Sequence, residues 1–370
     1  MLQKIIYFAF AITVFSACQN SPKPKRVSYK YNMYVGTYTK HEGHVEGKAK
    51  GIYHILLDDS LNIVSESVIT DVVNPSYITL SHNGKFLYSV EETAPTGMVK
   101  VFDIQSETPK LIGKASSEGA APCFIDINEN DSYLTVANYG GSTIAFPLAT
   151  DGSFGAPMPS ISFSGKGPTA RQESSHAHSA QFLPKHLDRF FVNDLGTDQT
   201  HVMEIGGNGQ LRIVDNLMEQ DSAGPRHSAF HPSATPHYVL NELNSTVSAW
   251  IDNRKAQTIS TLPKNYKDRN LCADIHITPD GRFLYATNRF HNSVAIFGID
   301  SSTFLLSFLG TEPSHGEIPR NFNITPDGKY LFCANQNSDN IIVFSINDNG
   351  SLTYKKEIKV MTPVCLKFGA

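Results

Sequence analysis

The chain has 370 residues, and 40% of them are hydrophobic, which is ample for a large buried core. The formal net charge is -4 with acidic and basic residues interspersed, so no basic stripe is available and we expect no nucleic-acid partner. In the body of the chain no stretch is apolar enough to span a membrane, so we expect membrane contact only through the N-terminus.

The first residues have the pattern of an export signal. Lys4 gives a short basic segment, residues 5–15 form an apolar run too short to cross a membrane, and small residues precede Cys18. Small residues directly before a cysteine resemble a bacterial lipobox. We predict a lipoprotein signal peptide over 1–17, lipidation of Cys18, a polar tether over 18–30, and an exported, membrane-anchored, periplasm-facing protein. An ordinary signal peptide is the alternative.

The later cysteines fall in different predicted strands and lack the paired spacing of a zinc site. They are Cys123, Cys272, Cys333 and Cys365. An exported protein could oxidise them, but their separation along the chain predicts buried free thiols rather than disulfides.

From residue 31 onward the chain has the composition of a series of short strands. Segments 31–39 and 51–57 are rich in Tyr, Val, Ile and Thr. The clearest unit, 274–300, has two strands joined by the tight turn at 279–281 and a third strand after a second turn. Similar outlines recur, and their first strands begin at Pro75, Pro122, His176, Pro225, Cys272, Pro319 and Pro363.

A repeat of about 45–50 residues in a β-rich chain is typical of a propeller. Full units lie between Pro75 and Ile346, and one strand, 363–368, remains at the end. The start of the domain supplies strands that lack a first strand, so joining the two ends completes a seventh unit and removes open sheet edges. We therefore predict an all-β, seven-bladed β-propeller over 31–370, monomeric, whose N- and C-terminal strands share one blade.

Propeller geometry brings unusual polar residues to one face. The first strand of each blade is innermost and the second is antiparallel to it. The start of the first strand and the end of the second therefore lie at the same mouth of the central channel, and a concave mouth with convergent polar groups is the usual ligand site. Residues at the starts of first strands are His176, His178, Arg226, His227 and Arg320, and residues at the ends of second strands are Glu91, Glu92, Asn138, Asp194, Glu242, Asn288, Arg289 and Asn335.

A long connection, 151–175, adds Arg171 and Glu173 to these candidates. Loops of this length are usually functional or disordered, and its density of polar groups favours function. Side chains two apart on a strand point the same way, so His176 and His178 could both face the mouth.

Simpler interpretations apply to several of these residues. Asparagine at a strand end is most simply a turn former, which concerns Asn138 and Asn335. Arg226 and Arg320 could bond carboxylates of neighbouring blades. His227 alternates away from its neighbours, so we interpret it as structural.

The residue types at the mouth suit ester or lactone chemistry on a sugar acid. Imidazole or carboxylate can act as a general base on water, while guanidinium groups bind carboxylate or phosphate and stabilise an oxyanion. The chain has no Gly-x-Ser-x-Gly motif that would signal a serine nucleophile. A hard cation could bind Glu242, Asn288 and Asn335, but the nearby arginines would repel it, so we expect no metal and no other cofactor.

Several phrases, taken in order along the chain, resemble those of one family. They are 34–38, 74–77, 136–141, 171–173 with 176–178, 193–198, 224–227, 241–243 and 334–336. Together they resemble the bacterial lactonase family of 6-phosphogluconolactonases, which are seven-bladed propellers related to the fungal carboxy-muconate lactonizing enzymes. The resemblance covers residues 31–370 and implies hydrolysis of a sugar lactone, phosphorylated or not, without a metal.

The related muconate enzymes imply a catalytic set of one His, one Glu and Arg residues. The resemblance places the His at His178, the Glu at Glu242 and one Arg at Arg226, and it leaves the other Arg open between Arg289 and Arg320. We expect His178, Glu242, Arg226 and Arg320 to be catalytic, with His178 or Glu242 activating water. The expected substrate-binding residues are His176, Arg171, Glu173, Arg289, Asn138, Asn288 and Asn335.

Two other functions remain open at this point. A non-catalytic propeller at the cell envelope could bind a sugar acid or a partner protein, because a fold does not settle function. The muconate resemblance also supports a cycloisomerase or lyase, which product analysis separates from hydrolysis. Because a phosphorylated lactone should be scarce outside the cytoplasm, an unphosphorylated aldonolactone is a substrate alternative for an exported enzyme.

Overall fold

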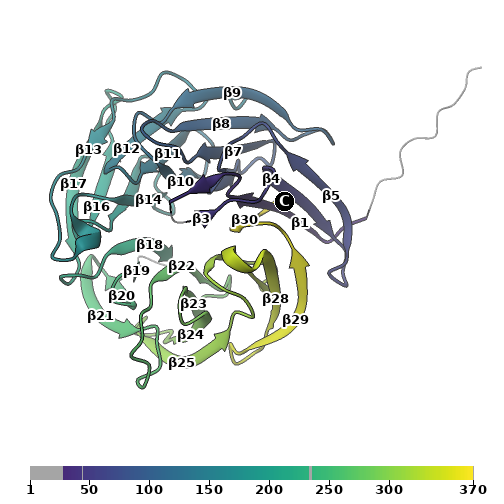
Figure 1. Cartoon of the computed structure of the whole chain (residues 1–370). Helices are drawn as coiled ribbons and strands as arrows, with labels where there is room; N and C mark the ends of the chain where they lie inside the picture. The colour runs from purple at the N-terminus through teal and green to yellow at the C-terminus, as the bar shows by residue number, and fades with distance from the viewer. Residues whose placement is uncertain (1–27, 44, 233–235, 370) are drawn as a thin grey trace, which may run out of the picture.

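The structure is a computed structural model that describes residues 28–43, 45–232 and 236–369. Seven four-stranded antiparallel sheets surround a central axis as blades (Figure 1), so the predicted seven-bladed propeller is confirmed. The predicted signal peptide, Cys18 and most of the tether lie outside the described residues. Within those residues, no helix has the length and apolar character needed to cross a membrane.

The first strand of each blade lies nearest the axis, since the first strands of neighbouring blades contact one another around the ring. The other three strands follow outward in order. Six blades are continuous in sequence. They are β6 (Ile78–Leu80), β7 (Phe86–Glu91), β8 (Met98–Asp103) and β9 (Lys110–Ser116); β10 (Pro122–Ile127), β11 (Tyr133–Asn138), β12 (Ser142–Pro147) and β13 (Ile161–Ser162); β14 (Ala177–Phe182), β15 (Arg189–Asp194), β16 (Gln199–Ile205) and β17 (Leu211–Met218); β18 (Pro225–Phe230), β19 (His237–Asn241), β20 (Thr246–Ile251) and β21 (Arg254–Ser260); β22 (Cys272–Ile277), β23 (Phe283–Asn288), β24 (Ser293–Ile299) and β25 (Leu306–Pro313); and β26 (Pro319–Ile324), β27 (Tyr330–Asn335), β28 (Asn340–Ile346) and β29 (Leu352–Lys359).

The seventh blade joins the two ends of the described chain. Its first strand is β30 (Pro363–Gly369), which pairs antiparallel with β1 (Tyr31–Thr37), so that Val35 lies opposite Leu366. The strands β4 (Ile52–Leu57) and β5 (Ile63–Ile69) complete the sheet. This pairing confirms the predicted shared blade, and it closes the ring with backbone hydrogen bonds rather than leaving an edge for another chain to extend.

Burial follows the order of the strands in a blade. Every residue of β23 is buried, because neighbouring blades cover both faces of the inner strands. The outer strand β9 has exposed and half-buried residues only, since its outer side meets water. The sequence reflects this arrangement, because the inner strands are continuous apolar runs and the outer strands have a more polar composition.

The turns between first and second strands account for the part of the repeat that is easiest to recognise in the sequence. Thr278 Oγ1 donates a 2.6 Å hydrogen bond to Asp280 Oδ1, and that oxygen also accepts from the backbone N of Arg282 at 3.1 Å. Gly281 has a φ of +75°, which costs glycine little. These turns lie on the face opposite the channel mouth, so the most repetitive residues of the chain have no part in the site.

Five of the first strands, β10, β14, β18, β26 and β30, carry a one-residue β-bulge near their starts. In β18, Pro225 lies opposite Asn241 and His227 lies opposite Leu240, which leaves Arg226 as the extra residue. A bulge re-aims the side chain of the extra residue, and here it turns that side chain toward the axis. The same break in register singles out Cys123, His178, Arg320 and Val364.

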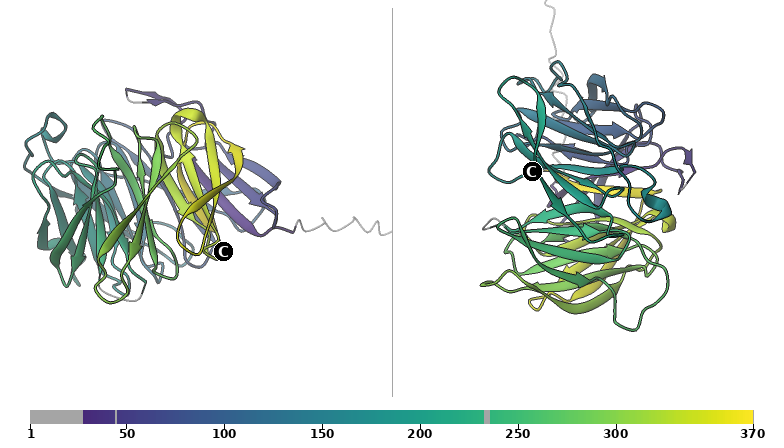
Figure 2. Two further views of the ribbon diagram at one scale, coloured as in Figure 1. Left: turned by 90° about the horizontal axis from the view of Figure 1, so that it is seen from below. Right: turned by 90° about the vertical axis from the view of Figure 1, so that its left-hand side faces the viewer.

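Short additional elements gather on the mouth side of the ring (Figure 2). They are the hairpin β2 (His41–Glu42) and β3 (Val45–Glu46) and the single 3-10 turns η1 (Ala170–Gln172) and η2 (Gln336–Ser338). The hairpin brings Glu42 to the channel mouth, and η1 belongs to the long connection that carries Arg171.

Candidate active site

Two sets of residues form the channel mouth, one from each inner strand of the blades. The first set consists of the bulge residues at the starts of the first strands. The second set consists of the residues that directly follow the second strands, and these are Tyr38, Glu92, Tyr139, Leu195, Glu242, Arg289 and Gln336. Because successive side chains of a strand point to opposite sides, each member of the second set faces away from the residue that ends its strand.

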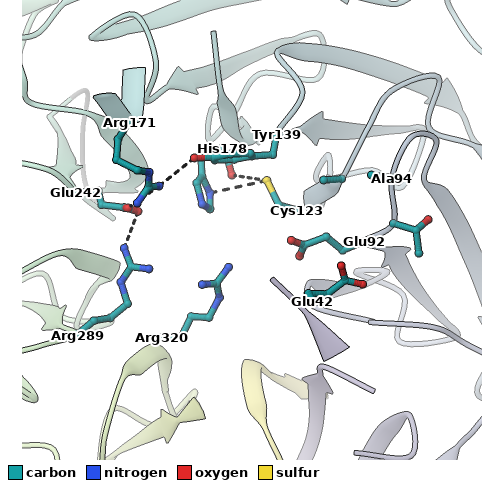
Figure 3. A pocket seen from close by; sticks show the side chains of 12 residues that line it. Glu42, Glu92, Ala94, Cys123, Tyr139, Arg171, His178, Glu242, Arg289 and Arg320 are labelled. Carbon is teal, nitrogen blue, oxygen red and sulfur yellow. Dashed lines mark hydrogen bonds and ion pairs between the residues drawn. The ribbon is translucent and has the colours of Figure 1, made fainter. Parts of the chain in front are cut away.

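A cavity of about 500 Å³ opens at this mouth, and both sets contribute to its wall (Figure 3). It is lined by Glu42, Glu92, Thr93, Ala94, Ala121, Cys123, Tyr139, Arg171, His178, Glu242, Arg289 and Arg320. The volume lies within the range of small-molecule sites. The structure therefore brings together five residues that the sequence predicted for the site, namely Arg171, His178, Glu242, Arg289 and Arg320.

Glu242 is held by three arginines. Its Oε2 lies 3.0 Å from Arg226 Nε and 2.8 Å from Arg289 Nη2, and its Oε1 lies 3.3 Å from Arg171 Nη2. Only 1% of the side chain is exposed. Burial alone would raise the pKa of this carboxyl, but the positive charges of Arg289, Arg226 and Arg171 lower it to about 2. Glu242 is therefore a fixed anion at neutral pH.

The opposite wall of the cavity carries Glu92 and Arg320, joined through Tyr38. The Tyr38 hydroxyl donates to Glu92 Oε2 at 2.9 Å and accepts from Arg320 Nη2 at 3.1 Å. Arg320 forms no ion pair with any residue of the described ranges, in contrast to Arg226 and Arg289. Burial raises the pKa of Glu92 above its ordinary value, and the nearby Arg320 offsets this only in part.

His178 and Cys123 lie between these two walls. The Cys123 Sγ is 3.9 Å from His178 Nδ1, and both side chains are buried. Burial, together with the positive charge of Arg226, keeps the pKa of His178 well below its ordinary value, so the imidazole is neutral at neutral pH. Burial likewise raises the pKa of the Cys123 thiol, which therefore stays protonated and is a poor nucleophile.

Arg226 adjoins the cavity without lining it. Its Nη1 donates to the backbone oxygen of Ala273 and lies 3.2 Å from His227 Nε2. On its other side the His227 ring places Nδ1 2.7 Å from Asp274 Oδ1. Since Arg226 also contacts Glu242, a buried polar chain runs from the cavity wall into the channel. Arg226 thus acts on the cavity through Glu242.

Two further predicted binding residues lie beside the cavity. The His176 ring stacks on Tyr139 with 4.4 Å between centroids, and its Nδ1 is 3.0 Å from the Tyr139 backbone oxygen. The exposed Glu173 lies 3.3 Å from His176 Nε2. The predicted convergence of His176 and His178 on the mouth is wrong for His176, because that imidazole supports Tyr139 instead of lining the cavity.

The three predicted asparagines are placed away from the cavity. The side-chain amides donate to backbone oxygens of the preceding connection, from Asn138 to Ser117 at 2.9 Å, from Asn288 to Thr261 at 3.1 Å and from Asn335 to Ser314 at 2.9 Å. All three are fully buried. Their predicted role in substrate binding is therefore not supported by the geometry, and the simpler interpretation of Asn138 and Asn335 as turn formers agrees with it. Within the described ranges no cluster of His, Cys, Asp and Glu has the arrangement of a metal site.

Sequence reasoning gave no role to several residues of the wall. Glu92 was placed at the mouth only by its strand position, while Tyr139, Cys123 and Glu42 were passed over. The position directly after each second strand could have identified two of them, because Glu92 and Tyr139 occupy the same position in their blades as Glu242 and Arg289. The hairpin that carries Glu42 has no counterpart in the repeat.

The fold and the cavity define a seven-bladed β-propeller with a small-molecule site at one mouth of its axis. The chain belongs to the family described as lactonase, 7-bladed beta-propeller, whose model matches residues 32–368. The family resemblance predicted from the sequence motifs is thereby confirmed.

Among similar proteins are two 6-phosphogluconolactonases. That of Bacillus subtilis (strain 168) is 33% identical over 351 residues, which cover 92% of this chain and 98% of the relative. That of Formosa agariphila is 36% identical over 271 residues, which cover 69% of this chain and 76% of the relative. The periplasmic gluconolactonase of Pseudomonas aeruginosa superposes with a TM-score of 0.84 at 26% identity, covering 92% of this chain and 99% of that one.

Proposed function

We propose that this protein hydrolyses a sugar lactone in the cavity at the channel mouth. The observation that carries the proposal is the meeting of three groups in a space of about 500 Å³. They are the neutral imidazole of His178, the carboxyl group of Glu92, and the guanidinium of Arg320, which forms no ion pair within the described part of the chain. A general base and a preorganised oxyanion donor are what water attack on a carbonyl requires. Membership of the lactonase family supports the same reaction class.

In this proposal Arg320 binds the carbonyl oxygen on which negative charge develops. The other guanidiniums, those of Arg171, Arg226 and Arg289, are engaged by Glu242. Glu242 keeps Arg171 and Arg289 in the wall, so we assign it the role of an anchor and not that of the base, which the sequence left open between His178 and Glu242. Arg171, whose side chain is 49% exposed, can reach the outer hydroxyl or phosphate group of a bound sugar.

The substrate that we propose first is an unphosphorylated aldonolactone. Two observations support it, namely the export signal expected from residues 1–17 and the similarity to a protein described as a periplasmic gluconolactonase. A phosphorylated lactone remains the alternative, because two relatives are 6-phosphogluconolactonases. Either substrate offers the same cyclic ester to Arg320 and His178.

We propose as well that the protein is exported and lipid-anchored through Cys18. The support is the apolar segment followed by small residues and a cysteine. When the full chain is expressed in bacteria and the cells are fractionated, we expect it in the membrane fraction, with Cys18→Ala released. An unchanged distribution of the variant would contradict the anchor.

The function is tested by following the opening of glucono-, galactono- and 6-phosphogluconolactone, each corrected for spontaneous hydrolysis. We expect acceleration with at least one lactone, and a loss of about 100-fold or more in kcat/KM for Arg320→Gln, the usual cost of removing an oxyanion donor. The matched control is Arg282→Gln, at an exposed turn of the opposite face, which should keep full activity. Saturable binding without turnover on the whole panel would instead indicate a binding propeller.

A further inference from the structure

The cavity holds two carboxyl groups that follow equivalent strands, Glu92 after β7 and Glu242 after β19. Only one of them is placed to exchange a proton during hydrolysis near neutral pH, because three arginines pair with Glu242 while no described arginine or lysine forms an ion pair with Glu92. When the surroundings give two such carboxyl groups different pKa values, the difference indicates which group performs the acid–base chemistry.

Glu242 has both carboxylate oxygens engaged. Arg171 contacts Oε1, and Arg226 and Arg289 contact Oε2, all within 3.3 Å. Protonating this carboxylate would break three ion pairs with arginines, two of which are themselves buried. The cost of that step makes Glu242 a poor proton acceptor, whatever its distance from the substrate.

Glu92 is arranged differently. Its Oε2 accepts one hydrogen bond, from the Tyr38 hydroxyl, and none of the described arginines or lysines forms an ion pair with it. The side chain points into the space between Cys123 and Arg320 (Figure 3). Glu92 also borders both the main cavity and a small space that continues it inward. A water molecule in the cavity can therefore reach this carboxylate directly.

The ionisable groups that face Glu92 belong to several elements. They are Tyr38, Glu42, Tyr77, Cys123, His178, Arg226, His227 and Arg320. Burial raises the pKa of Glu92, the positive charge of Arg320 and the hydroxyl groups of Ser76 and Tyr38 lower it, and Glu42 raises it further. The net direction is upward from the ordinary value, which moves this carboxyl toward the pH at which an enzyme needs a base.

We infer that Glu92, and not Glu242, takes the proton from the attacking water. The inference rests on the proposed lactonase function. The water oxygen bonds to the lactone carbonyl carbon, its proton passes to the Glu92 carboxylate, and the carbonyl oxygen becomes an oxyanion beside Arg320. When the carbonyl re-forms, the ring C–O bond breaks and the leaving alkoxide takes the proton back from Glu92. The product is a hydroxy acid, whose carboxyl group then releases one proton to solvent.

The test is a pH profile of kcat/KM on the best lactone of the panel, for wild type, Glu92→Gln and Glu91→Gln. We expect Glu92→Gln to lose about 100-fold or more in kcat and to lose the acid limb of the profile. Glu91 is the matched control, since it is the adjacent carboxylate, points into the blade and pairs with Lys100 at 3.0 Å. Its amide variant should keep both the rate and the limb.

A second variant keeps the inference testable should Glu92→Gln fold poorly. Tyr38→Phe removes the hydrogen bond that lowers the pKa of Glu92, so the acid limb should move to higher pH. The inference is overturned if wild type opens a lactone while Glu92→Gln stays within about twofold of its rate, or if the limb of Tyr38→Phe does not move. If wild type accelerates no lactone, the proposed function itself fails, and that outcome is distinct from the other two.

Discussion

The residue that ends the second strand of a blade and the residue that follows it have opposite surroundings, although one peptide bond separates them. Asn138 is buried in its blade and bonds the preceding connection, whereas Tyr139 lines the cavity. Asn288 and Arg289 repeat the same contrast. The alternation of side chains along an extended backbone is the cause. The comparison teaches that the blade uses one position to close itself and the next to build the site.

Among the residues that directly follow a second strand, Glu242 should give the largest loss of stability when it is changed. Glu242→Gln leaves Arg226 and Arg289 buried without their anion, and breaking a buried ion pair in this way costs about 3–5 kcal/mol. We expect that loss in the free energy of unfolding measured with urea. The control is Glu204→Gln, also between two arginines, Arg189 and Arg212, but these side chains are exposed, so screening by solvent makes the loss much smaller. Equal losses would contradict the anchor role.

The same carboxylate predicts a pH dependence. Its pKa falls from 4.5 to about 2 on folding, so its contribution to stability is present above pH 4.5 and is lost as the pH falls through the folded value. The shift corresponds to about 3 kcal/mol. The stability difference between wild type and Glu242→Gln should therefore shrink between pH 4.5 and pH 2 in parallel unfolding titrations. A difference that is constant over this interval would show that the ion pairs do not determine it.

Within one blade, Asn138→Ala tests the structural half of the comparison. The variant leaves the Ser117 carbonyl buried without its donor, which costs about 1–3 kcal/mol. We expect a lower melting temperature and an unchanged kcat/KM for the folded fraction. A drop in kcat/KM at full stability would return Asn138 to the substrate-binding residues that the sequence predicted.

The neighbouring change, Tyr139→Phe, should have the smallest effect and the opposite character. The hydroxyl accepts a 3.0 Å hydrogen bond from Arg171, which is half-exposed. Losing it should leave stability within about 0.5 kcal/mol. KM should rise about tenfold, as expected for about 1.5 kcal/mol of hydrogen bonding to a charged group. Steady-state kinetics and thermal unfolding of the two variants together decide whether the one-residue rule holds.

Much of the fold could be predicted from the sequence. The turns at Asp280 and its counterparts fix the spacing between first and second strands, and the leftover strand at 363–368 requires a partner near residue 31. These features are local and repeat, so one chain suffices to read them. The prediction also placed His178 and Glu242 at the same mouth, which the shared cavity bears out.

The three asparagines show where the sequence prediction of the site went wrong. Each stands at the last position of a second strand, and the side on which that position lies depends on register. The bulges that turn His178 and Arg320 toward the axis add a residue to one strand only, and nothing local to those strands marks where it falls. Asn138 and Asn288 stand one residue before Tyr139 and Arg289, which line the cavity, and of these two only Arg289 was among the predicted binding residues.

The sequence by itself determined a closed seven-bladed ring and the face on which its polar residues meet, because periodic turns and strand polarity are encoded within each unit. Only the tertiary structure decided which carboxyl is locked and which can accept a proton. The charges around Glu242 come from Arg171, Arg226 and Arg289, on separate blades and a connecting loop, while Glu92 faces Tyr38 and Arg320. Electrostatic interactions fall with distance in space and not in sequence, so these groups acquire their properties only when the ring closes.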